Sequence, residues 1–234
     1  MNSKTLLITG GSSGIGKAIA ELALEKRINV IILDKKQPDI SSDQMIYFPC
    51  DISNINELKA IIENIKQKQI NVDYLVNNAA VQFISSLESL DFDEWDYVFD
   101  VNLKAAVFLT KYISKDMKAG SQILNISSVH GSVPRDNKYA YDASKAALNM
   151  FSKEAALNLA KQGIKVNVLS LGATKTPLND NFNDNALYLD AVKKIPIGEV
   201  ADSNDIAKFA LYLLLEVDYA TGAMFVLDGG RSLL

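Results

Sequence analysis

The chain has 234 residues, 48% of them hydrophobic and 22% charged, which fits one large α/β domain with a substantial core. Its formal net charge of −4 gives no reason to expect a nucleic-acid partner, because nucleic-acid binding needs a basic surface. One cysteine and one histidine exclude an internal disulfide and the usual cysteine- or histidine-rich metal sites, so we expect no metal.

The amino-terminal stretch MNSKTLLITGG has too short an apolar run for a signal peptide. No other apolar run reaches the length of a membrane span. We therefore expect a cytoplasmic protein without a membrane partner, which needs a diffusible cofactor if it carries out redox chemistry.

Short runs rich in β-branched residues and leucine alternate with longer amphipathic stretches. The predicted strands are 5–9, 29–33, 45–48, 72–78, 122–127, 164–170 and 223–228. The predicted helices are 14–27, 54–68, 92–117, 139–162 and 203–216. Continuous apolar strands are typical of a parallel sheet covered on both faces, and the alternation indicates right-handed βαβ crossovers. The sequence therefore predicts a single doubly wound α/β domain over residues 1–234.

The segment 172–201 is the least regular part of the chain, rich in asparagine and aspartate with proline at 177 and 196. A long polar segment inside a compact domain is either a floppy loop or a functional lid. We favour a lid that covers a cofactor.

A glycine-rich loop, TGGSSGIGKAIA, joins the first predicted strand to the first predicted helix. Gly10, Gly14 and Gly16 would let backbone N–H groups and the helix N-terminus approach a pyrophosphate. The spacing is looser than the usual dinucleotide fingerprint, and a plain tight turn is the alternative. The context favours the cofactor, because the second predicted strand ends in Asp34.

A carboxylate at position 34 can accept hydrogen bonds from the adenosine ribose hydroxyls and would repel a 2′-phosphate. Lys35 and Lys36 follow and would weaken that repulsion. The sequence therefore favours NAD over NADP.

Tyr141 precedes Lys145 by four residues, so on a helix the two side chains share one face. Such a pair is either a proton-transfer device or part of a solvated surface, and the spacing alone does not decide between them. The surrounding motifs do. They are TGGSSGIG (9–16), CDIS (50–53), NNAA (77–80), DVNLKAAVF around Asn102, ISS (126–128), YDASK (141–145) and YATGAMFVLDGG (219–230).

In this order and spacing, the motifs resemble those of the classical short-chain dehydrogenases/reductases over residues 4–230. The resemblance implies a seven-stranded Rossmann-type sheet with helices on both faces and a nicotinamide cofactor. The helices predicted at 92–117 and 139–162 have wide apolar faces. Because the corresponding helices pair between subunits in that family, the resemblance also implies a homotetramer.

Carried over residue by residue, the resemblance makes Tyr141 the catalytic acid/base, Lys145 its partner and Ser128 the catalytic serine. Asn102 would complete the set by ordering a water. The same resemblance, with the glycine loop, gives the predicted cofactor contacts: Gly10, Ser12, Ser13, Gly14, Ile15, Gly16, Asp34, Asp51, Ile52, Asn78, Ala79, Tyr141, Lys145, Gly172, Thr174 and Thr176. Among these, Asp51 would bond the adenine amino group and Thr176 the nicotinamide carboxamide.

The chemistry accounts for these residue types. Moving a hydride between an alcohol carbon and nicotinamide requires moving the hydroxyl proton as well. The free pKa of tyrosine is about 10, and a cation one helical turn away should lower it. Ser128 can hold the substrate oxygen against Tyr141, and the water on Asn102 would give the proton a route from Lys145 to solvent.

The substrate is less well defined by the sequence. Gln82, His130 and Lys138 match the polar substrate residues of the 3-hydroxybutyrate dehydrogenases, so with Ser128 they would hold a small hydroxy acid through its carboxylate. The alternatives are a sugar or polyol, a 3-oxoacyl thioester, or a catalytically silent protein that binds NAD as a sensor or scaffold. The plainer interpretations are a loop imidazole bonded to backbone for His130 and an exposed lysine for Lys138.

Overall fold

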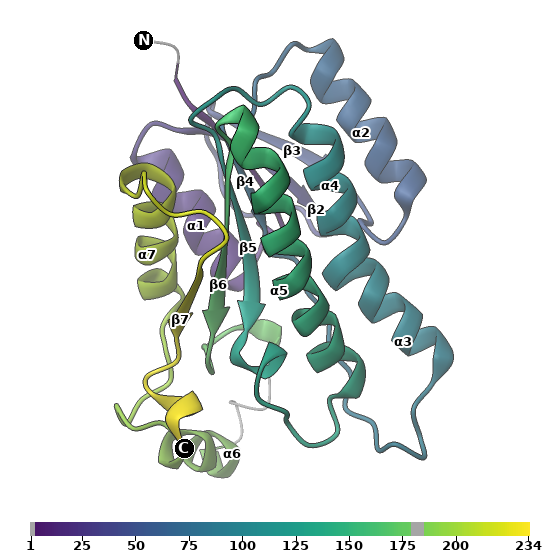
Figure 1. Ribbon diagram of the computed structural model, residues 1–234, viewed down its shortest axis with the longest axis vertical. Coiled ribbons are helices and arrows are strands. Elements are labelled where there is room, and N and C mark those ends of the chain that lie inside the picture. The colour runs from purple at the N-terminus through teal and green to yellow at the C-terminus, as the bar shows by residue number, and fades with distance from the viewer. Residues whose placement is uncertain (1–2, 179–184) are drawn as a thin grey trace.

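The computed structural model describes residues 3–178 and 185–234. Seven parallel strands form one sheet in the order β3-β2-β1-β4-β5-β6-β7. The strands are β1 (Thr5–Thr9), β2 (Asn29–Asp34), β3 (Met45–Pro49), β4 (Tyr74–Asn77), β5 (Gln122–Ser128), β6 (Lys165–Leu171) and β7 (Met224–Leu227). The predicted doubly wound, seven-stranded Rossmann-type sheet is therefore confirmed (Figure 1).

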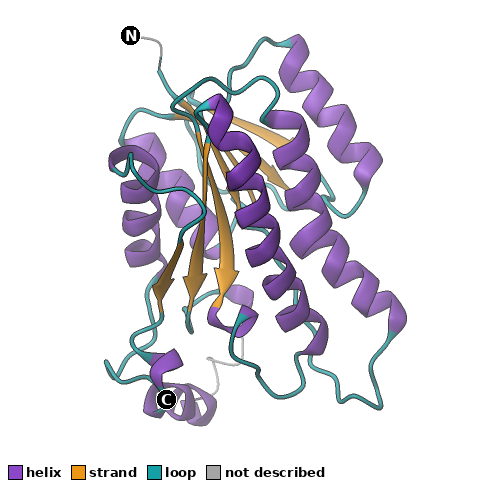
Figure 2. Cartoon of the chain, in the orientation of Figure 1, coloured by secondary structure: helices purple, strands orange, loops and turns teal. Residues whose placement is uncertain are grey.

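Helices cover both faces of the sheet (Figure 2). The helices are α1 (Gly14–Glu25), α2 (Ile55–Gln67), α3 (Phe92–Phe99), α4 (Ala105–Ile113), α5 (Tyr139–Leu159), α6 (Asn185–Lys193) and α7 (Ser203–Glu216). Helices α1 and α7 pack on one face, and α2, α4 and α5 pack on the other. Along the described ranges, no helix combines the length and apolar character needed to cross a bilayer.

The pleat of β1 distributes its side chains between two hydrophobic clusters. Leu6 and Ile8 are fully buried in the cluster under α1 and α7, whereas Leu7 is fully buried in the cluster under α2, α4 and α5. Successive residues of a strand point to opposite faces, so a strand covered on both sides must be apolar throughout. Burying each such side chain contributes about 1.5–3 kcal/mol, which fixes the strand from which the glycine loop emerges.

The sheet reverses its winding between β1 and β4, which lie side by side. In open α/β sheets, ligands bind outside the carboxyl ends of the strands at such a reversal. The loop after β1 carries Gly10, and the loop after β4 carries Asn78 and Ala79. The topology thus brings two of the predicted cofactor segments to one crevice.

The structure differs from the sequence-based prediction in two elements. The single helix predicted over 92–117 is divided by a π-helical turn, Asp100–Lys104, and ends at Ile113. The apolar spacing continues on both sides of this wider turn, so periodicity did not reveal it. The segment 172–201 contains α6, which its Asn- and Asp-rich composition concealed. Residues 179–184 of the predicted lid lie outside the described residues.

Candidate active site

The glycine loop is held close to the neighbouring strands. Gly10 and Gly14 adopt left-handed backbone angles, with φ of 67° and 51°. A Cβ on Gly16 would lie 2.0 Å from the Gly10 carbonyl oxygen and 2.5 Å from Nδ2 of Asn78. The backbone N–H groups of Ser12 and Lys36 each donate to the Asp34 carboxylate at 3.0 Å. Gly10 and Gly14 are therefore required for their left-handed backbone angles, and Gly16 because there is no space for a Cβ.

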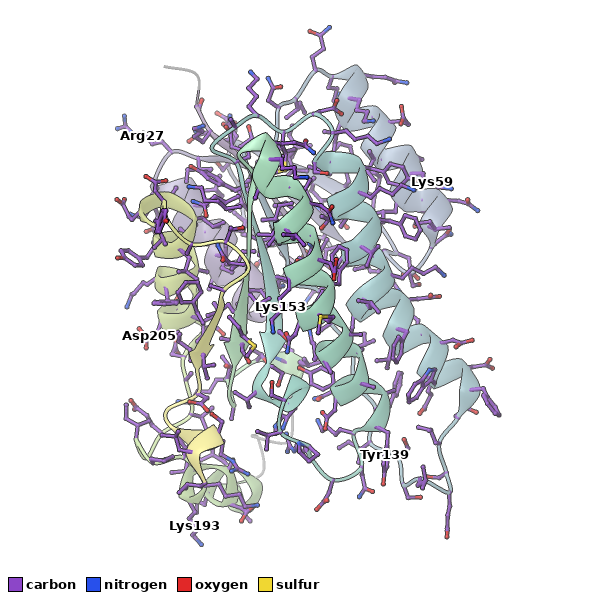
Figure 3. All side chains as sticks on the ribbon, viewed as in Figure 1. Arg27, Lys59, Tyr139, Lys153, Lys193 and Asp205 are labelled. Carbon is purple, nitrogen blue, oxygen red and sulfur yellow. The ribbon has the colours of Figure 1, made fainter. Side chains whose placement is uncertain are left out.

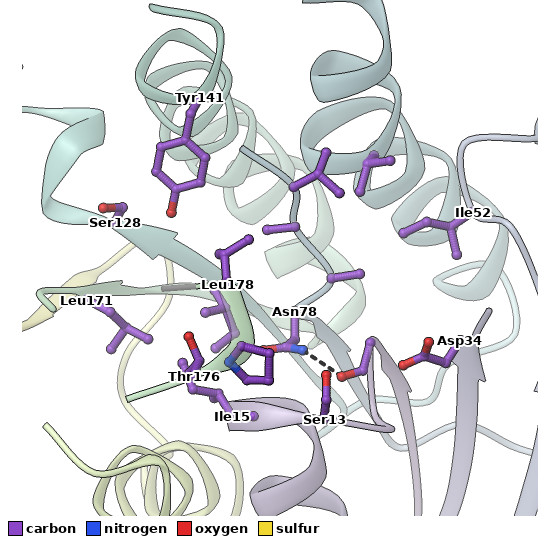
Figure 4. A pocket seen from close by; sticks show the side chains of 18 of the residues that line it. Ser13, Ile15, Asp34, Ile52, Asn78, Ser128, Tyr141, Leu171, Thr176 and Leu178 are labelled. Carbon is purple, nitrogen blue, oxygen red and sulfur yellow. Dashed lines mark hydrogen bonds between the residues drawn. The ribbon is translucent and has the colours of Figure 1, made fainter. Parts of the chain in front are cut away.

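A cavity of about 280 Å³ runs from this loop to Tyr141 (Figure 4). Fourteen of the sixteen predicted cofactor residues line it: Gly10, Ser13, Gly14, Ile15, Asp34, Asp51, Ile52, Asn78, Ala79, Tyr141, Lys145, Gly172, Thr174 and Thr176. The other two do not. Ser12 is buried, with its hydroxyl donating to the Lys36 carbonyl at 2.5 Å, and Gly16 is packed under Gly10. The donors, glycines and carboxylates of this cavity fit a dinucleotide.

Asp51 is paired within the protein. Its carboxylate lies 2.7 Å from the Lys35 ammonium, which also donates to the Tyr97 hydroxyl at 3.1 Å. Burial opposes ionisation of Asp51, but the hydrogen bonds from Lys35 and Ser53 hold its pKa below the ordinary value. Asp51, which the family resemblance assigned to the adenine amino group, thus holds the Lys35 ammonium.

The predicted acid/base group is assembled from β5 and α5. Ser128 ends β5, Tyr141 lies in the first turn of α5, and Lys145 lies one turn further on. The side chains of Tyr141 and Ser128 lie near each other in the cavity, with the Tyr141 hydroxyl pointing into it (Figure 4). The Lys145 ammonium lies 5.6 Å from the centre of the Tyr141 ring and donates to the Ile126 carbonyl at 2.9 Å.

The charges at this site differ from the sequence-based prediction. Burial raises the pKa of Tyr141 to about 12, which the bond to Ser128 offsets only in part. Burial also lowers the pKa of Lys145 to about 8. In the protein alone, desolvation is thus the main effect on both groups, and the predicted lowering of the Tyr141 pKa by Lys145 stays a prediction for the coenzyme-bound site.

Asn102 connects three elements from within the π-helical turn. Its side-chain oxygen accepts from the Val81 N–H at 2.8 Å, and its Nδ2 donates to the Val81 carbonyl at 2.9 Å and to the Ser144 hydroxyl at 3.0 Å. These bonds use both amide hydrogens. A water-ordering role for this residue would therefore fall to its backbone carbonyl, which a π-helical turn can release from regular helical bonding.

A second cavity, of about 380 Å³, shares Ser128 and Tyr141 with the first. Gln82 and His130 line it. Lys138 does not line the cavity but is buried next to Gln82, to whose side-chain oxygen it donates, and burial lowers its pKa to about 8. The structure thus brings the three predicted substrate residues to one region.

These contacts also test the plainer interpretation of each residue, which holds for His130 and fails for Lys138. His130 Nδ1 is 3.0 Å from the Val133 carbonyl, as a loop imidazole bonded to backbone would be. Lys138 is only 3% exposed, so it is not a surface lysine. Gln82 donates to the Leu178 carbonyl at 2.6 Å, which connects the substrate residues to the segment 172–201.

Several residues near the site were not singled out from the sequence. Thr9 begins the glycine-rich motif and accepts from the N–H groups of Asn78 and Ala79, whereas Tyr97, which lines the first cavity, belongs to no motif. Arg135 and Arg231 line the second cavity although they are far apart in the sequence. Within residues 3–178 and 185–234, no group of three or more histidine, cysteine, aspartate or glutamate residues could hold a metal ion.

Comparison with known proteins agrees with this geometry. A family model described as enoyl-(acyl carrier protein) reductase matches residues 10–232. Carbonyl reductase family member 4 of Xenopus laevis is 32% identical, over 99% of both chains. The NADP-dependent (R)-specific alcohol dehydrogenase of Lentilactobacillus kefiri is 33% identical, over 99% of this chain and 98% of its own. A 4-hydroxyisoleucine dehydrogenase mutant solved with NADH and succinate superimposes with a TM-score of 0.94 and 30% identity, over 99% of both chains.

Proposed function

This chain belongs to the classical short-chain dehydrogenase/reductase family, and we propose that within it the chain is an NAD-dependent dehydrogenase of a small hydroxy acid such as 3-hydroxybutyrate. As a member of that family it is an oxidoreductase that acts on CH–OH groups with a nicotinamide coenzyme. This membership argues against the alternative of a catalytically silent protein that binds NAD as a sensor or scaffold. The identity of the substrate and the preference for NAD are the proposed parts.

The observation that carries the substrate proposal is the buried ammonium of Lys138 beside Tyr141. Its nitrogen lies 5.8 Å from the centre of the Tyr141 ring and bonds to Gln82. Desolvating an ammonium is costly unless it meets an opposite charge, and a substrate carboxylate supplies that charge. The carboxylate would be held by Lys138 and Gln82. His130 would donate to it only as an imidazolium, because the single N–H of the neutral ring is used on the Val133 carbonyl.

The preference for NAD is supported by Asp34 at the end of β2. Its carboxylate lines the cavity and can accept hydrogen bonds from ribose hydroxyls. Lys35 is held by Asp51, which removes one of the two cations that would offset repulsion of a 2′-phosphate. The relatives include an enzyme named as NADP-dependent and a structure with NADH, so the preference has to be measured as the ratio of kcat/KM for the two coenzymes.

The residues of this chain account for the proton half of the reaction. A bound nicotinamide coenzyme supplies the acceptor for the hydride, that is, for the hydrogen and electron pair of the broken carbinol C–H bond. Ser128 holds the substrate hydroxyl, and Tyr141 as a phenolate takes the hydroxyl proton while the C=O bond forms. Lys145 stabilises the phenolate. Because burial raises the pKa of Tyr141 to about 12, the ionised form depends on nearby positive charge.

The proposal is tested by incubating the protein with NAD and (R)-3-hydroxybutyrate and following NADH formation. We expect saturable turnover that falls at least tenfold in Lys138→Ala and in His130→Ala. Lys59→Ala, an exposed position on α2, is the matched control. Undiminished turnover in both site variants, or no turnover while NAD binds normally, would overturn the hydroxy-acid substrate. A panel of sugars, polyols and 3-oxoacyl thioesters would then follow.

The remaining expectations stay predictions. A cytoplasmic location, a homotetramer, and a lid formed by the segment 172–201 were all expected from the sequence. The lid is supported by Thr176, Pro177 and Leu178, which line the first cavity from that segment.

A further inference from the structure

The lining of the second cavity has more cationic than anionic side chains. Arg135, Lys194 and Arg231 line it together with Asp136 and Asp190. The Lys194 ammonium lies 2.6 Å from the Asp190 carboxylate, so this pair is neutralised internally. In the part of the chain that the structure describes, the guanidinium groups of Arg135 and Arg231 form no ion pair.

The turn that carries Arg231 is stabilised by hydrogen bonds that do not involve the Arg231 side chain. The Asp228 carboxylate accepts from the N–H groups of Gly230 at 2.9 Å and Ser232 at 2.7 Å. Gly230 adopts a φ of 85° and packs against Pro196. The half-buried Arg231 is therefore positioned by its backbone, and it lines the second cavity together with residues of α6.

Arg135 extends the positive region toward the catalytic residues. Its backbone N–H donates to the Asp142 carboxylate at 2.8 Å, which fixes the loop directly before α5. Its charge contributes to lowering the pKa values of His130 and Lys138, after the larger effect of burial. Arg135 and Arg231 thus line the same cavity as Tyr141.

The cavity is larger than a short monocarboxylate requires. Its volume of about 380 Å³ lies within the range of roughly 300–1,000 Å³ typical of sites for drug-sized ligands. The proposed carboxylate position is beside Lys138 and Tyr141, and Arg231 lines the same cavity as Tyr141, so it could meet a second acidic group of the substrate. A planar guanidinium matches a carboxylate through two parallel hydrogen bonds.

We propose that Arg231, assisted by Arg135, binds a second carboxylate, so that the preferred substrate is a hydroxy-dicarboxylate rather than a hydroxy-monocarboxylate. This inference rests on the proposed hydroxy-acid function and deepens it. The reacting secondary alcohol lies between the two acidic groups, with one held by Lys138 and the other by Arg231.

Direct binding tests the site without depending on turnover. In the presence of NADH, calorimetric titration compares glutarate with hexanoate, which is of similar length but has one charge. We expect glutarate to bind the wild-type protein at least tenfold more tightly. Arg231→Gln should remove roughly tenfold to a hundredfold of glutarate affinity, with little effect on hexanoate, and Arg231→Lys should restore part of it.

Lys193→Gln is the matched control. It removes the same charge from the last turn of α6, where the exposed side chain points away from the rest of the molecule (Figure 3). Equal binding of glutarate and hexanoate to the wild-type protein, or equal losses in Arg231→Gln and Lys193→Gln, would overturn the second carboxylate site.

Turnover separates this inference from the proposed function. We expect kcat/KM for 3-hydroxyglutarate to exceed that for 3-hydroxyhexanoate at least tenfold, and the ratio to collapse in Arg231→Gln. If neither acid is oxidised but glutarate still binds through Arg231, the proposed reaction fails and the dicarboxylate site stands. If both are oxidised equally well, the reaction stands and the second site fails.

Discussion

At the scale of single residues, Lys145 is buried and Tyr141 is half-buried, and desolvation shifts each toward its neutral form. Near pH 7 Tyr141 therefore keeps its proton, whereas Lys145, with a pKa of about 8, is still largely an ammonium. Ionisation of Tyr141 for proton transfer then depends on further positive charge beside it. Ser128 lines the same cavity as Tyr141, where we expect it to hold the substrate oxygen.

The first prediction concerns the Tyr141 hydroxyl. Tyr141→Phe removes the proton carrier, and general acid–base catalysis typically contributes about 10²–10⁴-fold. We expect kcat to fall by about that factor while NAD affinity changes little, as measured by steady-state kinetics and NAD titration. Tyr139→Phe, at the exposed position two residues earlier, is the control. A kcat for Tyr141→Phe near that of the wild type would contradict the assigned role.

A second prediction concerns the pH dependence of carboxylate binding. Burial, with the charge of Arg135, lowers the pKa of Lys138 to about 8, while Asp142 opposes the shift. Lys138 is therefore an ammonium below pH 8 and a neutral amine above it. We expect the affinity for butyrate, an unreactive monocarboxylate, to be highest below pH 8 and to fall up to tenfold per unit above it.

Lys138→Gln isolates this effect. The variant keeps Lys145, whose pKa is also lowered to about 8, so any remaining slope reports Lys145. We expect weak butyrate binding that is independent of pH between about 7 and 9.5. A wild-type affinity that stays constant across pH 8 would show that Lys138 does not hold the carboxylate.

Tyr141 and Lys145 could be located from the sequence because they belong to a motif with fixed spacing. The sequence could not give their charge states, because burial of Tyr141 and Lys145 depends on packing between β5 and α5. It also missed Arg135 and Arg231, which no local pattern joins. Their proximity arises only when the loop before α5 and the turn after β7 meet over α6.

At the scale of secondary-structure elements, the junction of β1 and α1 is the most constrained part of the site. Gly16 lies in the first turn of α1, directly under the Gly10 carbonyl and beside Asn78. Asn78 in turn donates to the carbonyls of Thr9 and Gly10 at 3.0 and 3.1 Å. The strand, the loop and the helix are therefore held together by backbone contacts that leave no room for a methyl group.

A third prediction follows from that packing. In Gly16→Ala, the new Cβ would meet backbone at 2.0 Å, so the loop must move. We expect a loss of at least about 2 kcal/mol in the free energy of unfolding and at least tenfold weaker NAD binding. Urea unfolding and NAD titration measure the two effects.

Gly120→Ala is the comparison variant. Gly120 has a φ of 91° but no neighbouring atom within 4 Å, so its substitution tests backbone strain without a clash. We expect it to lose stability but to retain NAD affinity. If Gly16→Ala bound NAD as well as Gly120→Ala does, the contact with Gly10 would not be what shapes the site.

Most elements were predictable because apolar runs and helical periods are local signals. The π-helical turn Asp100–Lys104 was not, because its cause is tertiary: Asn102 bonds to Val81 and Ser144 on other segments. Helix α6 was concealed for the opposite reason. It follows a polar stretch typical of a loop, and its ordered turns lie beside the carboxyl ends of the strands (Figure 1).

At the scale of the whole molecule, α5 carries apolar side chains that the single chain does not cover. Met150 and Leu157 are 60% and 71% exposed, and their spacing of two helical turns places them on one face. Helix α5 also carries Tyr141 and Lys145 on its buried side. Contacts between subunits on the outer face would therefore hold the helix that positions the acid/base group.

The fourth prediction is that the protein is a homotetramer that uses this face. We expect sedimentation to give a tetramer for the wild type and smaller species for Leu157→Glu, because a buried charge without a partner is strongly unfavourable. Lys59→Glu, on the exposed side of α2, should leave the tetramer intact. A monomeric wild-type protein would contradict the prediction.

The packing of α1 against α7 has a consequence for how the chain is made. The two helices share one hydrophobic cluster, yet Glu25 ends the first and Ser203 begins the second. During translation at about 5–20 residues per second, the apolar side of α1 would wait on the order of 10–40 seconds for its partner. Until synthesis is nearly complete, the glycine loop of the nascent chain therefore precedes a helix, α1, whose apolar side is not yet covered by α7. Coenzyme binding should therefore be a late event in the life of each new molecule, and ribosome-bound chains that end before α7 should depend on chaperones.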